Sequence, residues 1–430
     1  MKDYIILREH EMQRLQVLEQ VLGKGLSLKA ASGLMKVSYR QAKRLFARYR
    51  REGPKSLAHH HRGRPAPNAL GLEVRDRVLE LHREIYSLFN DTHFVEMLEE
   101  REGLRIGRET VRRWLREAGI RPKRRRRPPK HRSRRLRRPQ IGLLMQWDGS
   151  PHRWFGPLRP AASLLHASDD ANGTVLGALF RPQEDAIGYL RLLDMVLRRH
   201  GVPAAVYQDR HSALFRNDNY WSHEEELAGI RFPTHVGHVL QELSVKTIPA
   251  FSPQAKGRIE RQGGTFQDRL VAEMDLENIT EIDQANAWLD NVYLDRFNAR
   301  FAKMPELPGT AFRKISAAQR YLLVSFAYEA TVANDNTVRL GGLVLDLPPG
   351  PHRRSYARSR VLVRQHLDGA WTVWLDGHCI GRHAPTPLRE PFRGRRPHQP
   401  GDNHRANHIL QVYLETTPAP LTKGTFMLGS

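Results

Sequence analysis

The sequence contains one cysteine, Cys379, among 430 residues. A single thiol excludes an intrachain disulfide and any zinc site built from several cysteines, and it fits a reducing cytosolic compartment. No stretch of 18 apolar residues is present, so we expect no membrane-spanning helix. The apolar run in MKDYIILREHEMQRL is too short for the hydrophobic segment of a secretory signal.

Acidic residues are scarce relative to basic ones. The chain has 46 Asp and Glu against 69 Lys and Arg, which gives a formal net charge of +23. Such an excess repels itself unless a polyanion neutralises it. Nucleic acid is therefore the first partner to consider and an anionic membrane surface the second. Hydrophobic residues make up 40% of the chain, enough for the cores of the several domains that its length predicts.

Residues 1–57 predict a helix-turn-helix DNA-binding domain. In SLKAASGLMKVSYRQAKRLFARYRREG, Ser27 and Ser38 stand where two successive helices would begin, and serine is a preferred N-cap residue. A short helix, a tight turn and a basic helix are typical of the helix-turn-helix motif, although any small helical hairpin has the same pattern. The basic helix would present to DNA the residues Tyr39, Arg40, Gln41, Lys43 and Arg44.

Residues 72–120 predict a second helical DNA-binding domain. Two amphipathic segments, LEVRDRVLELHREIYSLFND and THFVEMLEEREG, precede GRETVRRWLREAGI, which resembles another recognition helix. Its apolar side would carry Val111, Trp114 and Leu115. Its polar side would present Arg108, Thr110, Arg112 and Arg113.

Two linkers are rich in basic residues. Residues 58–71 contain RGRP, whose Arg62 and Arg64 could enter a narrow minor groove as in an AT-hook, or could belong to a plain basic linker. Residues 121–140 hold 12 Lys or Arg and no acid, so they should order only on a phosphate backbone or serve as a tether or localisation signal. The predicted DNA contacts in this second linker are Arg124, Arg125, Arg126 and Arg127.

From residue 141 the pattern changes to that of a mixed α/β domain. LLMQWDGS, PAASLLHASDD and TVLGALF are typical of three strands, the last two joined by an Asp/Asn/Gly turn. A helix, the strand PAAVYQDRH, a second helix, the strand VKTIPAF and a long helix follow. This order predicts an α/β ribonuclease H-like catalytic core over residues 141–302, with a connector over residues 303–325.

Residues 326–385 are rich in strand signals. The Asp368–Gly369 pair marks a hairpin turn between two of the expected strands. We predict a small C-terminal β-barrel, which would contact DNA, contact protein or cap the core. Residues 386–430 are rich in proline, arginine and histidine, and we expect them to be disordered.

Three acids are candidates for catalysis because of where they lie. Asp148 ends the first strand, next to Trp147, which should point into the core; Asp209 ends the fourth strand; and Glu260 lies about two turns into the long helix. Three carboxylates that converge repel one another without cations, and divalent ions with oxygen ligands remove that repulsion. The alternative for Glu260 alone is an exposed i,i+4 ion pair with Lys256.

The segments QWDGSPHRWF, YQDRHSALF and FSPQAKGRIERQGGTFQDRL resemble the DDE catalytic core of transposases and retroviral integrases. The closest resemblance is to bacterial insertion-sequence transposases of the ISNCY group with a retroviral-integrase-like core, and the order of parts along most of the chain agrees with it. The resemblance implies that Asp148, Asp209 and Glu260 are the catalytic metal ligands. It implies two Mg²⁺ ions, with Mn²⁺ as a substitute.

The sequence departs from the family pattern in two places. The step from Asp209 to Glu260 is 51 residues, longer than integrases commonly have, and the extra segment falls within RNDNYWSHEEELAGIRFPT. The position seven residues after the glutamate, where many such enzymes have Lys or Arg, is Gln267. The basic residues that could contact DNA instead are Lys256, Arg258, Arg261 and Arg269.

The resemblance implies a DNA transposase that binds the terminal inverted repeats of a mobile element. It would cleave DNA to expose 3′-OH ends and join those ends to target DNA. We expect double-stranded DNA as partner, no membrane, a homo-oligomer of at least two chains on DNA, and a bacterial cytoplasmic location at the nucleoid. Two alternatives remain open: a metal-dependent nuclease with the same core, and a DNA-binding regulator whose core is inactive.

Overall fold

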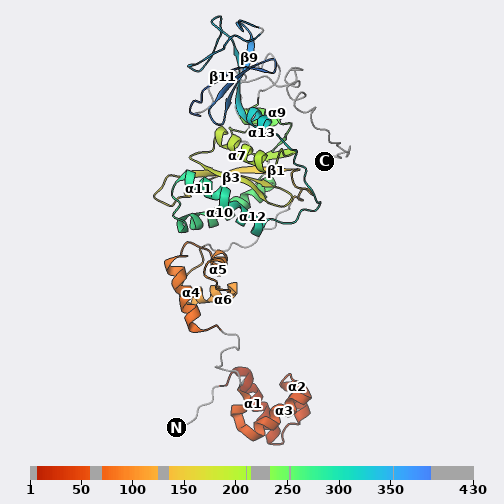
Figure 1. The fold of residues 1–430 in the computed structure, drawn as a ribbon. Coiled ribbons are helices and arrows are strands. Elements are labelled where there is room, and N and C mark those ends of the chain that lie inside the picture. Colours follow the sequence, from red (N-terminus) through yellow and green to blue (C-terminus); the bar gives the residue numbers. More distant parts are fainter. Residues whose placement is uncertain are drawn as a thin grey trace. The chain divides into compact units, whose positions relative to one another are not determined.

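The structure, a computed structural model, describes residues 7–58, 70–123, 135–209, 211–214, 233–250, 253–351 and 353–388. The chain divides into two compact units, Met1–Val78 and Leu79–Ser430. Figure 1 labels the helices and strands. No helix within the described residues combines the length and the apolar content needed to cross a membrane.

The first unit contains the predicted helix-turn-helix elements. Ser27 Oγ accepts a hydrogen bond from Ala30 N, and Ser38 Oγ accepts one from Gln41 N, both at 3.2 Å, so both predicted N-caps are confirmed. The caps fix where the two helices begin because they satisfy backbone donors that the first helical turn leaves free. The elements are α1 (Glu9–Leu22), α2 (Leu28–Leu34), α3 (Tyr39–Glu52) and the 3₁₀ turn η1 (Gly53–Leu57). Their common core comprises Leu18, Ala31, Met35, Ala42, Tyr49 and Leu57.

Three further helices follow residue 70. The first helix ends at Glu84, before the end of the amphipathic segment predicted for it. Asn90 caps the second helix, because its side-chain oxygen accepts hydrogen bonds from the backbone N–H groups of Thr92 and His93. The third helix buries Val111, Trp114 and Leu115, as predicted. The helices are α4 (Leu72–Glu84), α5 (Asp91–Glu100) and α6 (Arg108–Glu117).

The catalytic-core region is built on one mixed five-stranded sheet. Its strand order is β3-β2-β1-β4-β5; the pairs β3–β2 and β2–β1 are antiparallel, and β1–β4 and β4–β5 are parallel. The predicted succession of three strands, helix, strand, helix, strand and helix is confirmed. The strands are β1 (Met145–His152), β2 (Ala162–Asp169), β3 (Val175–Arg181), β4 (Ala205–Gln208) and β5 (Lys246–Pro249).

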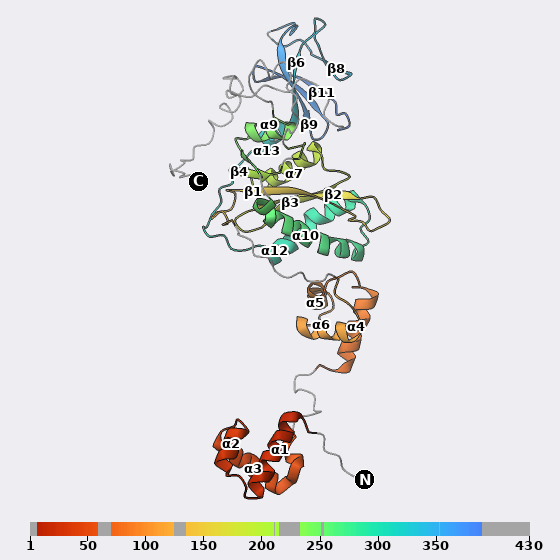
Figure 2. The same ribbon diagram turned by 180° about the vertical axis from the view of Figure 1, so that it is seen from behind.

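Helices cover both faces of this sheet. One face lies against α7 and α9 and the other against α10, α11 and α12, as Figures 1 and 2 show from opposite sides. Successive side chains of β1 point to opposite faces of the sheet. Trp147 is fully buried on one face and contacts Tyr189 of α7, with 5.2 Å between ring centroids. The neighbouring Asp148 lies on the other face, where it contacts Lys256 of α10. The prediction for Trp147 is confirmed. The helices are α7 (Ala186–Arg199), α9 (His235–Glu242), α10 (Pro253–Leu276), α11 (Ile282–Trp288), the π-helical turn η2 (Leu289–Tyr293) and α12 (Leu294–Phe301).

The C-terminal region is antiparallel β structure. A four-stranded sheet has the order β11-β10-β9-β6, and β7 and β8 form a separate two-stranded ribbon. Gly369, with φ of +89°, lies in the turn between β9 and β10, so the predicted Asp-Gly hairpin is confirmed. Among the described strands, β11 and β6 are the two edges of the larger sheet. The elements are α13 (Ala317–Leu323), β6 (Ser325–Thr331), β7 (Thr337–Leu340), β8 (Leu343–Asp346), β9 (Arg360–His366), β10 (Trp371–Leu375) and β11 (His378–His383).

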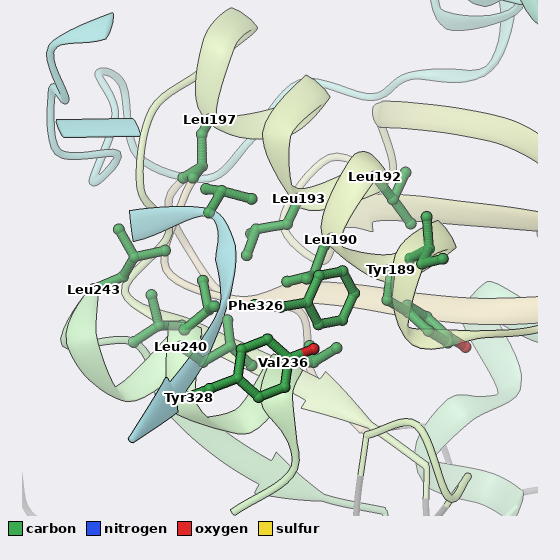
Figure 3. Close-up of a cluster of buried hydrophobic side chains, with 14 of the residues drawn as sticks. Tyr189, Leu190, Leu192, Leu193, Leu197, Val236, Leu240, Leu243, Phe326 and Tyr328 are labelled. Atoms are coloured by element: carbon green, nitrogen blue, oxygen red, sulfur yellow. The ribbon is translucent and has the colours of Figure 1, made fainter. Parts of the chain in front are cut away.

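Strand β6 joins the C-terminal sheet to the core. Phe326 and Tyr328 are fully buried and belong to the same apolar cluster as Leu190 of α7 and Val236 of α9. Figure 3 shows these side chains facing one another from the strand and the two helices. The C-terminal sheet therefore completes the hydrophobic layer over one face of the central sheet.

Candidate active site

Two of the predicted acids lie on or just after adjacent parallel strands. Asp209 directly follows β4, as predicted, whereas Asp148 lies within β1 and not at its end, because β1 continues to His152 in its pairing with β2. Gln146 of β1 pairs with Tyr207 of β4, and two residues further along each chain segment lie Asp148 and Asp209. Parallel strands carry residues at equal offset to the same edge of a sheet. The register therefore brings these two carboxylates together, as their positions in the sequence predict.

Lys256 of α10 lies between the two aspartates. Its Nζ donates to Asp148 Oδ1 at 2.6 Å and lies 3.1 Å from Asp209 Oδ2. The lysine side chain is only 8% exposed. Burial alone would lower the pKa of Lys256, but the two carboxylates raise it above its ordinary value, so the amine stays charged. Burial raises the pKa of Asp148, and the Lys256 ammonium opposes that rise.

Glu260 lies one helical turn beyond Lys256, with its side chain exposed. It forms no ion pair with another described residue. Within the described ranges, no three His, Cys, Asp or Glu side chains are gathered closely enough to hold a metal ion. The structure thus brings together Asp148 and Asp209 but not the full predicted triad. The two carboxylates already meet at one cation, and oxygen donors of this kind fit a hard divalent ion.

A further carboxylate, Glu184, lies beside the aspartates just before α7. The helix itself is capped by the next residue, Asp185, which accepts a hydrogen bond from Gly188 N at 2.7 Å. Glu184 instead accepts a hydrogen bond from the Tyr189 hydroxyl, and its Oε1 lies 3.6 Å from His211 Nδ1. Burial raises the pKa of Glu184, and the two nearby aspartates add to that rise. No local signal could identify it, because its position depends on the path of the chain between β3 and α7.

His166 is a second group that sequence reasoning did not select. It is the cross-strand partner of Asp148 and is fully buried. Burial and the Lys256 ammonium lower the pKa of His166 to about 3, so the imidazole is neutral. Neither ring nitrogen has a hydrogen-bond partner among the described residues.

Other residues of α10 connect the helix to its surroundings. Arg258 Nη1 lies 2.5 Å from Asp170 Oδ1, and Arg135 at the end of the basic linker reaches the same oxygen at 2.6 Å. Gln267 donates to Ser150 Oγ of β1 at 3.0 Å, which fixes the helix against the strand. Of the other basic residues of α10 that could contact DNA, Arg261 is exposed and Arg269 pairs with Glu96 at 2.5 Å.

The predicted DNA-contacting residues of the two helical regions lie on helix surfaces. All five on α3 are exposed, and on α6 the three arginines are exposed while Thr110 is half-buried. Lys43 lies over the ring of Tyr39, 4.9 Å from its centroid. Contact of these side chains with DNA stays a prediction. The predicted residues that lie outside the described ranges are Arg62, Arg64, Arg124, Arg125, Arg126 and Arg127.

Comparison with known proteins identifies the class. A helix-turn-helix domain family matches residues 13–66. The protein named "Putative transposase y4bF" from Sinorhizobium fredii (strain NBRC 101917 / NGR234) is 35% identical over 353 residues, which span 78% of this chain and 76% of the relative. The transposase for insertion sequence IS1202 of Streptococcus pneumoniae is 28% identical over 398 residues, which span 84% of this chain and 83% of the relative. The chain therefore belongs to this family of insertion-sequence transposases.

Solved structures give weaker likenesses. A chain of the simian T-cell lymphotropic virus intasome, in complex with PP2A regulatory subunit B56 gamma, is 14% identical with a TM-score of 0.29, and the match covers 73% of this chain and all of that one. The HTLV-2 integrase catalytic core domain in complex with magnesium is 15% identical with a TM-score of 0.24, and the match covers 36% of this chain and 88% of that one. At TM-scores this low, neither likeness bears on mechanism.

Proposed function

We propose that this chain binds the terminal inverted repeats of a mobile element, cleaves DNA to expose 3′-OH ends and joins those ends to target DNA. The observation that carries the proposal is the convergence of Asp148 and Asp209 on a single cation where β1 and β4 lie side by side. Two carboxylates held this way by adjacent strands form a rigid anchor for metal-dependent phosphodiester chemistry. Family membership supplies the biological context, because both relatives are named as transposases.

Asp148, Asp209 and Glu260 are the metal ligands in this proposal, with Mg²⁺ as the ion and Mn²⁺ as a substitute. When bound, two such ions activate an attacking oxygen and stabilise a leaving oxygen. The protein's own contribution is positional. Strands β1 and β4 fix the two aspartates, and α10 carries Glu260 on the same helix as the cations that would meet phosphate.

The N-terminal regions would hold the element ends. Helix α3 exposes a row of polar and basic side chains, and α6 exposes a second one. Insertion of such a helix into the major groove reads base edges, while neighbouring arginines contact phosphates. The same proposal has four further parts. At least two chains assemble on DNA, the core is ribonuclease H-like, the C-terminal sheet closes into a barrel, and the chain is a member of the ISNCY group.

An Asp148→Asn variant tests the proposal with element-end DNA and Mg²⁺. We expect it to bind the DNA as the parent does and to lose both cleavage and strand transfer. Asp295→Asn, at an exposed position of α12, is the matched control and should retain both steps. Pre-cleaved ends distinguish a transposase, which joins them, from a nuclease, which does not. Cleavage by the Asp148→Asn variant would refute the assignment of the site.

A further inference from the structure

Lys256 holds a position that a metal ion would need. Its ammonium donates a hydrogen bond to Asp148 and lies 3.1 Å from Asp209, so it compensates the negative charge of both carboxylates. The lysine side chain is 8% exposed, while those of Asp148 and Asp209 are 16% and 37% exposed, so a buried cation lies between two partly exposed carboxylates. A buried charge is retained only where opposite charge compensates it, which these two aspartates do.

An ammonium and a divalent ion cannot share this place. Both are cations, and like charges in a site of low polarity repel strongly. Any ion bound by Asp148 and Asp209 must first displace the lysine. Lysine is suited to leave, because its charge is carried on a flexible four-carbon stem and is a point charge without fixed geometry.

Glu260 is arranged as the counterpart of Lys256. The two residues are four apart on α10, so they occupy the same side of the helix one turn from each other. Lys256 is buried while Glu260 is exposed. A metal ion between the aspartates would favour the opposite arrangement, with Lys256 exposed and Glu260 turned inward, since it repels the ammonium and attracts the carboxylate. The next residue, Gly257, has no atom within 4 Å of where its side chain would begin, so the surface beside Lys256 is open.

We infer that Lys256 is an exchange residue, which neutralises Asp148 and Asp209 until metal binds and then turns outward to a DNA phosphate while Glu260 turns in. This inference rests on the metal site of the proposed function and deepens it. It makes metal binding and DNA binding mutually supportive, because the ion releases a cation that the DNA backbone can use.

Amine labelling of the full-length chain tests the exchange. The chain is treated with a limiting dose of acetic anhydride with and without Ca²⁺, and the acetylation of each lysine is measured by mass spectrometry. We expect the rate at Lys256 to rise about tenfold or more with Ca²⁺, as protection of a buried group is lost. The rate at Lys314, which is exposed in the connector, should stay unchanged and serves as the internal reference.

Two outcomes distinguish failure of the metal site from failure of the exchange. Calorimetry with Ca²⁺ alone first establishes whether the chain binds the ion; a chain that binds none overturns the proposed metal site and the exchange with it. A chain that binds Ca²⁺ while Lys256 stays protected overturns the exchange and leaves the metal site standing.

A Lys256→Gln variant gives a second measurement. Because the competing cation is removed, we expect Ca²⁺ to bind several-fold more tightly than to the parent, and the gain in DNA affinity that Ca²⁺ gives the parent should disappear. Lys314→Gln is the matched control and should behave as the parent does. Equal or weaker Ca²⁺ binding by a folded Lys256→Gln chain would overturn the exchange.

Discussion

Glu184 lies directly over the α-carbon of Gly149, the residue that follows Asp148. A side chain starting at Gly149 would place its Cβ 2.2 Å from Glu184 Oε2. Tyr189 holds the same carboxylate through its hydroxyl. Glycine at this position therefore makes room for a third carboxylate beside the two aspartates.

A Gly149→Ala substitution should separate stability from activity. The clash falls on the flexible end of Glu184, so we expect a loss of at most about 1 kcal/mol in unfolding free energy. Displacement of a group beside the reacting centre should lower strand transfer between about tenfold and about a hundredfold. Thermal melting and strand-transfer assays measure the two effects. A second change, Glu184→Asp, shortens the acid and should recover part of the activity, whereas parental activity in the Gly149→Ala chain would show that Glu184 has no role.

The ion pair between Arg364 of β9 and Glu242 of α9 should stabilise the attachment of the C-terminal sheet. The side chains are 4% and 13% exposed, and the guanidinium contacts both carboxylate oxygens. An Arg364→Met chain leaves the buried Glu242 carboxylate without its guanidinium partner, which should cost about 3–5 kcal/mol. Urea unfolding measures it. The control Arg339→Met breaks an exposed pair with Asp335 and should change stability by no more than about 1 kcal/mol.

The same pair predicts a pH dependence. Burial alone would raise the pKa of Glu242, but Arg364 and His238 lower it below its ordinary value. Glu242 is therefore protonated at higher pH in the unfolded chain than in the folded chain. The stability that its ionised form contributes is complete above the pKa of Glu242 in the unfolded chain, and it is lost as pH falls through the pKa of Glu242 in the folded chain. We expect Glu242→Gln to be less stable than the parent at pH 7, with the difference shrinking toward pH 3. Melting temperatures of both chains between pH 7 and pH 3 measure the difference in stability. A difference that grows in acid would contradict the lowered pKa of Glu242.

Helix α3 should account for part of the salt dependence of DNA binding. Replacing Arg40 and Arg44 with glutamine removes two cations from its exposed face. If each contacts one phosphate, the slope of log affinity against log salt should fall by about 0.9 per residue. Titration of element-end DNA at several salt concentrations measures the slope. Lys24→Gln, in the loop before α2, is the control and should leave it unchanged; an unchanged slope in the double variant would exclude α3 from the phosphate backbone.

Local rules were enough to predict much of this architecture. The N-caps at Ser27 and Ser38 depend on residues three positions apart, and the buried face of α6 depends on helical period alone. The meeting of Asp148 with Asp209 needed only the order of strands. These features are set by neighbours in the chain or by a single pairing register.

The role of Lys256 could not be read in the same way. Lys256 and Glu260 have equivalent places on one helix, so periodicity does not say which of them turns inward. The choice depends on how closely α10 approaches β1. At Gly263, a side chain would begin 3.5 Å from His166 Nε2 and 3.9 Å from Ser150 Oγ, which shows how near helix and sheet come. The distance between helix and sheet is set by tertiary packing and not by the local sequence.

The place of Phe326 and Tyr328 has a consequence for the gene that encodes the chain. A reading frame that stops after Val324 would leave the apolar layer of α7 and α9 uncovered, and patches of this kind drive association. Expression of a chain ending at Val324, and its partition between supernatant and pellet, would measure this; a soluble product would contradict it. We therefore expect a coding sequence truncated at its 3′ end to produce an aggregation-prone polypeptide.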